Sequence, residues 1–126
     1  MDNERKSMPM VALRGMTILP EMVVHFDVSR ERSISAVQEA MTEEQKIFLA
    51  AQKSIETDNP GKEDIYEVGT VATVKQIIRL PKHTVRVLVA GEKRGILREI
   101  EYDDPYLRAL VEIVEESDTE IPDNVN

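Results

Sequence analysis

The positions of hydrophobic residues predict two strands at the start of the chain. Residues 8–14 (MPMVALR) form a short apolar run, which predicts a buried strand, and Gly15 allows a turn after it. Between residues 18 and 28 apolar and polar residues alternate, and a period of two predicts a strand with one buried face. The side chains expected on that face are Met22, Val24, Phe26 and Val28.

The period of the pattern changes after Ser29, a residue type that favours the cap of a helix. Ile34, Val37 and Met41 are three and four residues apart, so on a helix they form one apolar stripe. These positions predict a helix over residues 30–41, with Ser29 as its N-cap and with charged residues on its other sides.

The middle of the chain predicts a buried strand, a loop and a long strand. Residues 47–51 (IFLAA) are continuously apolar, which is typical of a strand buried on both faces, whereas residues 53–64 contain Asn-Pro-Gly and predict a loop. Residues 66–80 are rich in β-branched side chains, and Gly69 among them predicts a bulge or a close approach of another backbone. The face predicted to be buried contains Tyr66, Val68, Ala72, Val74, Ile78 and Leu80.

The C-terminal third predicts further strands. Residues 81–84 predict a tight turn, and the alternating valines of residues 85–89 complete a β-hairpin with the long strand before them. Residues 96–100 predict another short strand. Residues 106–115 fit a helix and a strand about equally well, and we favour a strand because they follow a run of strands.

The order of elements is strand, strand, helix and then strands, without an internal repeat. This order predicts a small mainly β (α+β) domain, in which one helix packs against a partly closed barrel. We expect residues 1–7 to form a flexible polar tail and the residues from Ser117 onward to be disordered.

Composition and charge narrow the classes of function. The length of 126 residues suits one domain, and 41% hydrophobic with 32% charged residues indicates a globular fold. The net charge of −8 disfavours nucleic acid as a partner, because nucleic acid attracts basic surfaces. The sequence has no cysteine, which excludes disulfides and thiolate metal sites and agrees with a cytoplasmic location. No apolar run approaches the roughly 20 residues of a membrane helix, so we expect no membrane partner.

The sequence offers no convincing active site. The stretch VAGEKRGIL places two glycines around basic residues, but their spacing differs from that of a phosphate-binding loop and no helical pattern follows. His25 and His83 are too few to form a zinc site, and no serine has the setting of an activated nucleophile. Asp103 and Asp104 precede a proline, which is typical of a solvated turn. We therefore predict no catalytic, cofactor-binding or metal-binding residue.

Two groups of residues are candidates for contact with a partner. Methionine-rich apolar groups suit binding to varied partners, although burial in the core is the more frequent outcome for such residues. The charged candidates lie in the first turn of the predicted helix, where an ordinary solvated surface is the alternative. The apolar group is Met16, Ile18, Leu19, Pro20 and Met22, and the charged pair is Glu31 and Arg32.

Four stretches of the chain carry a resemblance to a known family. In order along the chain, they resemble the N-terminal part of Lon, the ATP-dependent bacterial protease: LRGMTILPEMVVHFDVSRERSI, IFLAAQK, DNPGKEDIYEVGTVATVKQIIRLP and TVRVLVAGEKRGIL. The resemblance covers about residues 8–115. It departs at His83, where the family usually has the glycine of an Asp-Gly turn. We therefore expect a positive φ at His83 or a different type of turn.

The resemblance implies a fold and a function. The family's N-terminal domain is PUA-like, with one packed helix. It is not catalytic, it helps to recognise unfolded or damaged proteins, and it supports a homohexameric ring. An AAA+ ATPase module, which uses ATP and magnesium, and a Ser-Lys peptidase module follow it in the family. We expect residues 8–116 to be this domain, residues 117–126 to be a tail or linker, and the chain to be part of a longer serine protease.

The leading hypothesis is therefore a substrate-recognition and assembly domain of an ATP-dependent Lon-type protease. RNA binding is an alternative because PUA-like folds often bind RNA, although the net charge of −8 argues against it. A second alternative is a stand-alone relative of Lon that acts as an adaptor.

Overall fold

The computed structural model describes residues 4–58 and 60–114. These residues form six strands, one α-helix and one short 3-10 helix, so the predicted mainly β fold with one packed helix is confirmed. The elements are β1 (Arg5–Leu13), β2 (Val23–Val28), α1 (Glu31–Thr42), β3 (Lys46–Ala51), η1 (Lys62–Asp64), β4 (Val68–Leu80), β5 (Thr84–Tyr102) and β6 (Leu107–Val114).

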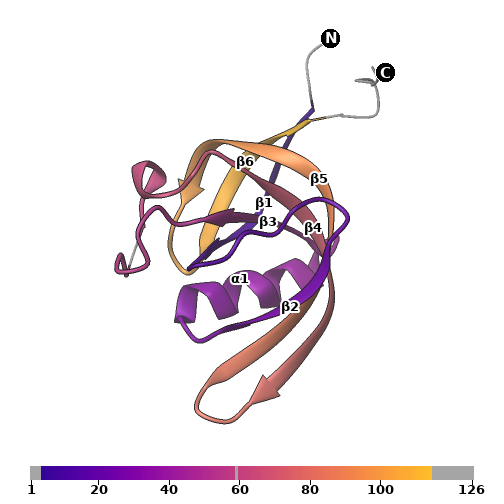
Figure 1. Cartoon of the computed structure of the whole chain (residues 1–126), viewed down its shortest axis with the longest axis vertical. Helices are drawn as coiled ribbons and strands as arrows, with labels where there is room; N and C mark the ends of the chain where they lie inside the picture. Colours follow the sequence, from indigo (N-terminus) through magenta and orange to yellow (C-terminus); the bar gives the residue numbers. More distant parts are fainter. Residues whose placement is uncertain (1–3, 59, 115–126) are drawn as a thin grey trace.

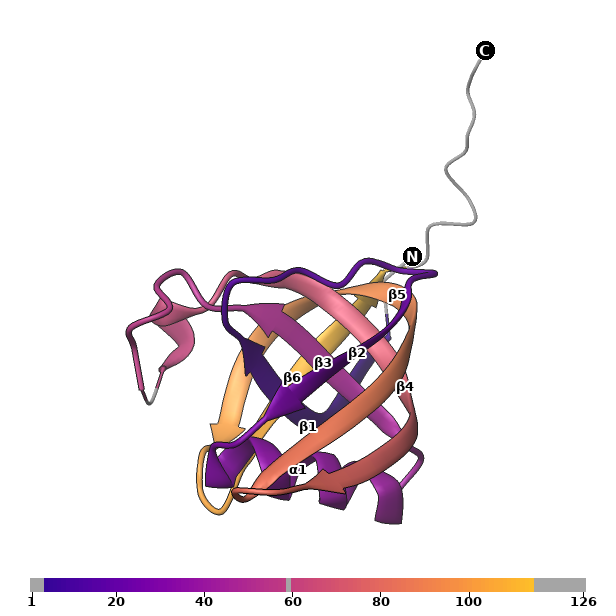
Figure 2. The same ribbon diagram turned by 60° about the horizontal axis from the view of Figure 1, so that its bottom comes forward.

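The strands form one curled sheet in the order β2-β5-β4-β3-β1-β6. All neighbouring pairs are antiparallel except β1 and β3, which run parallel. Strand β5 is long enough to pair with β2 and β4 and also with β6, so the ladder returns to β5 and the sheet becomes a pseudo-barrel. Figure 2 shows α1 lying across the lower end of this pseudo-barrel.

The core consists of two clusters of buried side chains. One cluster lies between the helix and the sheet, and the other consists almost entirely of strand residues. The first cluster packs α1 against β2 and the hairpin end of β4 and β5, and it includes Val37 and Val87. The second cluster lies between β1, β3 and β6, with the fully buried Phe48 at its centre. Buried small residues Ala36 and Ala40 let the helix lie close to the sheet.

Most of the predicted elements are confirmed, with shifted ends. Strand β1 begins at Arg5 because its first residues pair with β6, so residues 5–7 are not part of a flexible tail. Strand β6 confirms the choice of a strand over a helix for residues 106–115. Residues 1–3 and the predicted C-terminal tail lie outside the described residues.

The helix differs from its prediction in two details. Arg30, not Ser29, occupies the N-cap position, and its side chain makes no capping hydrogen bond. Met41 is exposed because it lies in the last turn, whereas the residues that face the sheet are centred on Ala36 and Ala40. The predicted stripe was therefore correct for Ile34 and Val37 and wrong for Met41.

Strand β4 departs from simple alternation. Its pairing with β5 shifts at Val71/Ala72, where β5 has an extra residue, and at Val74/Gln76, where β4 has one and its later side chains move to the other face. Ala72 and Val74 are buried as predicted, whereas Ile78, after the second shift, is exposed and Leu80 is half-buried. Tyr66 and Val68, which precede both shifts, are exposed as well. Gly69 confirms the predicted close approach, since a Cβ there would lie 2.5 Å from the Leu49 carbonyl oxygen.

Strand β5 runs without interruption through the stretch VAGEKRGIL, which was predicted to connect two separate strands. The bulge opposite Val71/Ala72 falls within it, so the chain bends while it stays in the sheet. Gly91 is buried at this bend, and a Cβ there would overlap the Leu19 carbonyl oxygen. The glycine therefore serves a close approach of two backbones and not a phosphate.

The β4–β5 turn confirms the expectation for His83. The φ angle of His83 is 60° and that of Lys82 is 63°. Both lie in the left-handed region that an Asp-Gly turn normally uses, and histidine tolerates it better than most side chains.

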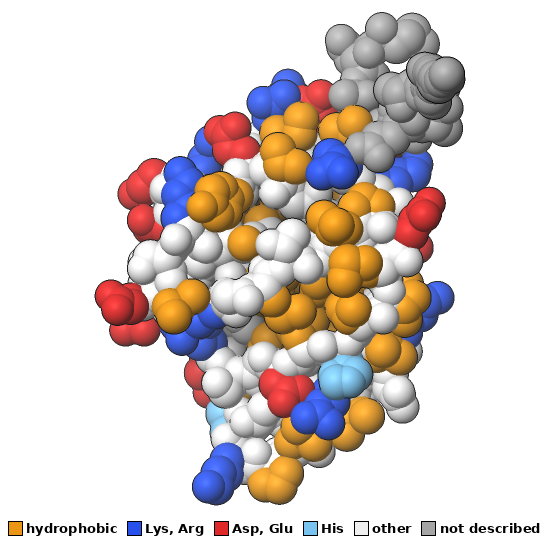
Figure 3. Space-filling model, viewed as in Figure 1, with side chains coloured by type: hydrophobic (Ala, Val, Ile, Leu, Met, Phe, Trp, Pro, Cys, Tyr) orange, Lys and Arg blue, Asp and Glu red, His pale blue; other side chains and the backbone are white. Residues whose placement is uncertain are grey.

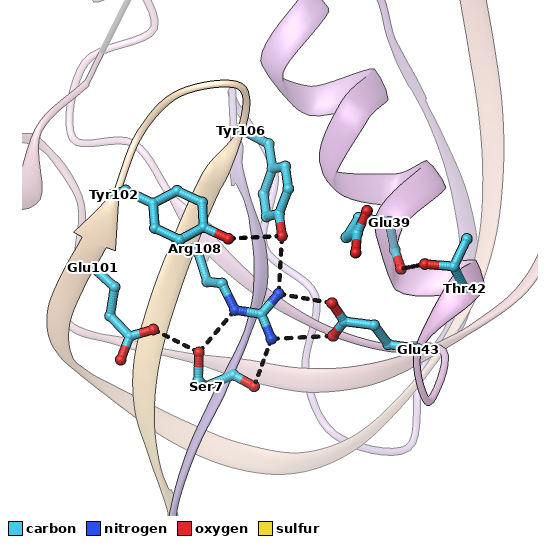
Figure 4. A network of polar contacts seen from close by, with 8 residues as sticks. All are labelled: Ser7, Glu39, Thr42, Glu43, Glu101, Tyr102, Tyr106 and Arg108. Carbon is cyan, nitrogen blue, oxygen red and sulfur yellow. Dashed lines mark hydrogen bonds and ion pairs between the residues drawn. The ribbon is translucent and has the colours of Figure 1, made fainter.

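A polar network fixes the last turn of α1 to the sheet (Figure 4). The Arg108 guanidinium donates to both oxygens of Glu43 at 2.9 and 3.1 Å, to the Tyr106 hydroxyl at 2.9 Å and to the Ser7 hydroxyl at 2.8 Å. The Ser7 hydroxyl in turn donates to Glu101 at 2.6 Å. These hydrogen bonds lower the pKa of Glu43 and raise that of Arg108. The network joins α1 to β1, β5 and β6.

Replacing Gly91 with alanine is expected to destabilise the fold. The new Cβ overlaps a backbone oxygen, so β5 or the segment before β2 must move, at a cost of about 1–3 kcal/mol. Urea unfolding measures this difference. Gly61→Ala is the matched control, because its nearest neighbour is a flexible Glu63 oxygen at 3.4 Å. Equal unfolding midpoints for the two variants would contradict the account.

Replacing Glu43 with glutamine is expected to lower the free energy of unfolding by about 1–2 kcal/mol at neutral pH. Because Arg108 lowers the pKa of Glu43, the contribution is full above the carboxyl's pKa in the unfolded chain and is lost as the pH falls through the folded pKa. The two proteins should therefore converge in stability in acid. Glu44→Gln, which breaks only an exposed pair with Lys6, should change stability by less than about 0.5 kcal/mol. A Glu43→Gln effect that persists unchanged in acid would contradict this assignment.

Candidate functional site

The segment of residues 14–22, between β1 and β2, crosses the front of the molecule in Figure 1. Its backbone is held at several points. The Thr70 hydroxyl donates to the Ile18 carbonyl, and the Met22 amide donates to the Leu19 carbonyl at 3.2 Å. The Glu21 amide donates to the Gly91 carbonyl at 2.9 Å, and the Gly91 amide donates to the Met22 carbonyl at 2.8 Å. The segment therefore has a defined shape although it belongs to no strand.

The apolar residues proposed for partner contact divide between core and surface. Ile18 is only 2% exposed and belongs to the core. Met16 and Met22 are half-buried against the same core, and Pro20 is also half-buried. Leu19 has an exposed fraction of 48%. The core alternative was therefore right for Ile18, and Leu19 has the most exposed side chain of the group.

Other apolar side chains that flank this segment are exposed, and the sequence did not predict them as contact residues. Val23, at the start of β2, is 66% exposed, and Ile55, beside Gly15, is 60% exposed. Tyr66 and Val68 line a pocket of about 140 Å³ together with residues 17 and 18. Figure 3 shows hydrophobic side chains gathered on this side of the molecule. We call Leu19, Val23, Ile55, Tyr66 and Val68 the apolar face.

The charged candidates lie elsewhere, at the first turn of α1. The Glu31 carboxylate lies 3.2 Å from Nε2 of His83, and Arg32 lies 3.9 Å from the Asp103 carboxylate. Glu31 and Arg32 line a pocket of about 390 Å³. The structure therefore does not bring the two predicted groups into one site.

A neighbouring pocket connects the two regions. It has a volume of about 120 Å³ and is lined by Met16 and Phe26, and it shares Arg14, Arg30 and Ser33 with the larger pocket. We call the larger of the two the arginine pocket, because Arg14, Arg30 and Arg32 line it. Sequence reasoning missed Arg14 because it follows a strand that lies far from the helix in the sequence.

Arg30 supports the shape of the arginine pocket. Its guanidinium donates to the Ala12 carbonyl at 2.6 Å and to the Asp58 carbonyl at 3.2 Å, so it joins the end of β1 to the loop after β3. Burial lowers the pKa of Arg30, and the nearby positive charge of Arg14 lowers it further. The nearby charge of Asp58 opposes these two effects.

Side chains that could bind a metal ion are not grouped in the part of the chain that the structure describes. Within residues 4–58 and 60–114, no three His, Cys, Asp or Glu side chains form a group that would hold a metal ion. In the same residues, no helix is both long and apolar enough to span a membrane. His25 is exposed on β2 and His83 on the β4–β5 turn, so the histidines lie on separate elements.

The fold and the two surfaces define a small β-rich binding domain. Residues 7–125 match the family model of the ATP-dependent protease La (LON) substrate-binding domain. The chain is 49% identical over 112 residues to a Lon protease of Desulforamulus reducens and 51% identical over 112 residues to that of Clostridioides difficile. These matches cover 89% and 88% of this chain but only 14% of each relative. The chain belongs to the family of Lon protease substrate-binding domains.

Solved structures agree on the fold. The N-terminal domain of the Mycobacterium avium complex Lon protease superposes with a TM-score of 0.70 at 22% identity, covering 94% of this chain and 59% of that one. A Lon N-terminal domain protein from Xanthomonas campestris gives a TM-score of 0.68 at 16% identity, covering 94% and 66%. The resemblance to Lon and the role in substrate recognition are thus confirmed, and neither RNA binding nor a stand-alone adaptor is favoured.

The two arginines at the start of α1 are expected to differ in their effect on stability. Arg30→Gln removes a half-buried guanidinium that holds two backbone carbonyls, so the free energy of unfolding should fall by about 1–3 kcal/mol. Arg32→Gln breaks only a long, exposed contact and should change it by less than about 0.5 kcal/mol. Thermal and urea unfolding measure both. Equal stability of the two variants would show that Arg30 does not support the pocket.

Proposed function

We propose that the apolar face binds exposed hydrophobic segments of unfolded or damaged proteins and delivers them to an ATP-dependent Lon-type serine protease. The observation that carries the proposal is the group of large apolar side chains left exposed around a segment whose backbone is fixed. Exposed apolar groups of this kind are typical of interaction sites. Leu19 and Val23 are central because they lie on or directly after that segment.

The proposed binding is weak at each domain and gains strength by repetition. The face consists of separate exposed side chains, of which Tyr66 and Val68 line two pockets, and such a surface suits many different sequences better than one. The half-buried Met16 and Met22 add adaptable side chains at its border. In a homohexameric cytoplasmic protease, with AAA+ and Ser-Lys peptidase modules in each subunit, six such domains would act on one unfolded chain with avidity. A further role in assembly of the ring is part of the same proposal.

Leu19→Ser is expected to weaken the binding of an unfolded protein. A permanently unfolded and fluorescently labelled protein, such as reduced and carboxamidomethylated α-lactalbumin, is titrated with this chain and followed by anisotropy. Losing the partly exposed leucine surface should weaken binding about fivefold. The combination with Val23→Ser should weaken it further.

Ile78→Ser is the matched control. Ile78 is also a large apolar residue, with an exposed fraction of 42%, but it lies on the hairpin part of β4. The control should bind like the unchanged chain, and all variants should unfold at similar urea concentrations. Loss of binding that is equal for Leu19→Ser and Ile78→Ser would count against the apolar face and in favour of general stickiness.

A further inference from the structure

The arginine pocket brings together charges from separate parts of the chain. Arg14 follows β1, whereas Arg30 and Arg32 lie at the start of α1. The pocket has a volume of about 390 Å³, which is large enough for a side chain and its neighbouring backbone. Its apolar lining residues are Ala12, Pro60 and Leu107.

Two arginines outside the pocket are paired closely with carboxylates. Arg86 donates to both oxygens of Asp27 at 2.8 and 3.1 Å, and Arg108 donates to both oxygens of Glu43 at 2.9 and 3.1 Å. A two-point contact of this kind matches the planar fork of the guanidinium to a carboxylate and is among the stronger polar contacts in proteins.

The arginines of the pocket lack such a contact. Arg14 reaches Asp58 at 3.4 Å and Arg32 reaches Asp103 at 3.9 Å, both beyond the usual range of a charged hydrogen bond. Among the described residues, no carboxylate lies within ion-pair distance of Arg30. Arg30 donates its hydrogen bonds to backbone carbonyls, which carry no net charge and therefore do not neutralise the guanidinium.

The acidic side chains that line the pocket offset its arginines only in part. Three guanidiniums and the two carboxylates of Glu31 and Asp58 line it, and the side chain of Asp58 is 89% exposed to solvent. The lining therefore keeps an excess of positive charge on a chain with a net charge of −8. A buried or half-buried cation without a close counterion is costly, so an anion that enters is stabilised.

We infer that the arginine pocket binds a carboxylate of a protein substrate. The inference rests on the proposed function, since the substrate is a protein segment that also contacts apolar surface. The pocket lined by Met16 and Phe26 shares Arg14 and Arg30 with the arginine pocket, so an apolar side chain and a carboxylate of one extended segment fit next to each other. The substrate class is a segment in which hydrophobic residues lie beside an acidic group.

The net charge selects a single carboxylate over a polyanion. A nucleic acid carries one negative charge for every nucleotide. The protein, with its net charge of −8, repels such a polyanion over most of its surface. One carboxylate requires only the local charge of the pocket. The apolar lining also accommodates the methylene groups of a glutamate, which phosphate does not have.

The test uses short labelled peptides made of leucine, serine and glycine. One peptide has a central glutamate and an amidated end, the second has glutamine in its place, and the third has the glutamine with a free terminal carboxylate. Each is titrated with this chain and with Arg14→Gln/Arg32→Gln, which removes two exposed pocket charges. Arg5→Gln/Lys75→Gln is the matched control, because it removes two exposed positive charges outside the pocket.

The unchanged chain should bind the glutamate peptide about tenfold more tightly than the amidated glutamine peptide. Arg14→Gln/Arg32→Gln should abolish this preference while its affinity for the glutamine peptide stays the same, and the control should keep the preference. Raised salt should reduce the preference for the glutamate peptide and leave the affinity for the amidated glutamine peptide unchanged. A preference for the third peptide instead would support the inference and identify the carboxylate as a chain end.

Three results would overturn the inference. Equal affinity of the unchanged chain for all three peptides would show that a carboxylate is not recognised. The proposed binding of apolar segments by the apolar face would still stand. A preference that persists in Arg14→Gln/Arg32→Gln would place the carboxylate outside the pocket. Failure of the chain to bind any of the peptides would contradict the proposed function itself and this inference with it.

Discussion

The contact between the Leu19 carbonyl and Gly91 is the constraint on which the rest of the structure depends. Only glycine allows the two backbones to lie so close, and hydrogen bonds on both sides of the contact join Gly91 to Glu21 and Met22. The bulge in β5 occurs at the same place, so the strand bends here and its two halves serve different neighbours. One glycine therefore lets the sheet curl into a pseudo-barrel and fixes the segment that crosses it.

This constraint explains why apolar side chains remain on the surface. Hydrogen bonds that join Ile18, Glu21 and Met22 to β4 and β5 hold the crossing segment on both sides of Leu19, whose side chain is left 48% exposed. A face that is fixed before binding loses little conformational entropy when a substrate arrives. The two ends of the helix differ in a similar way. At the last turn, Arg108 and Glu43 form a close two-point contact that supports the fold, whereas the arginines at the first turn have no such contact.

Local pattern was enough to predict most of the fold and little of the site. Alternation and helical spacing depend on neighbours in the sequence, so they located most strands, the helix and the buried role of Val37. They divided β5 into two strands and did not decide between helix and strand for residues 106–115. The exposed position of Ile78 depends on the irregular pairing at Val74/Gln76, and the contact at Gly91 joins residues far apart in the chain. The arginine pocket likewise combines Arg14 with the helix. Interactions of this kind have no local signature, and the family resemblance supplied the type of fold and the function but not these contacts.

Amide hydrogen exchange of Glu21 and Gly91 tests the central claim, that the apolar face is formed before a substrate binds. Both amides donate hydrogen bonds across the contact between the crossing segment and β5. In the chain without substrate they should exchange as slowly as the amides of the β4–β5 ladder, because opening either requires the sheet to separate. Exchange at the rate of an open loop, while the ladder stays protected, would mean that the segment is not held and that the face forms only on binding.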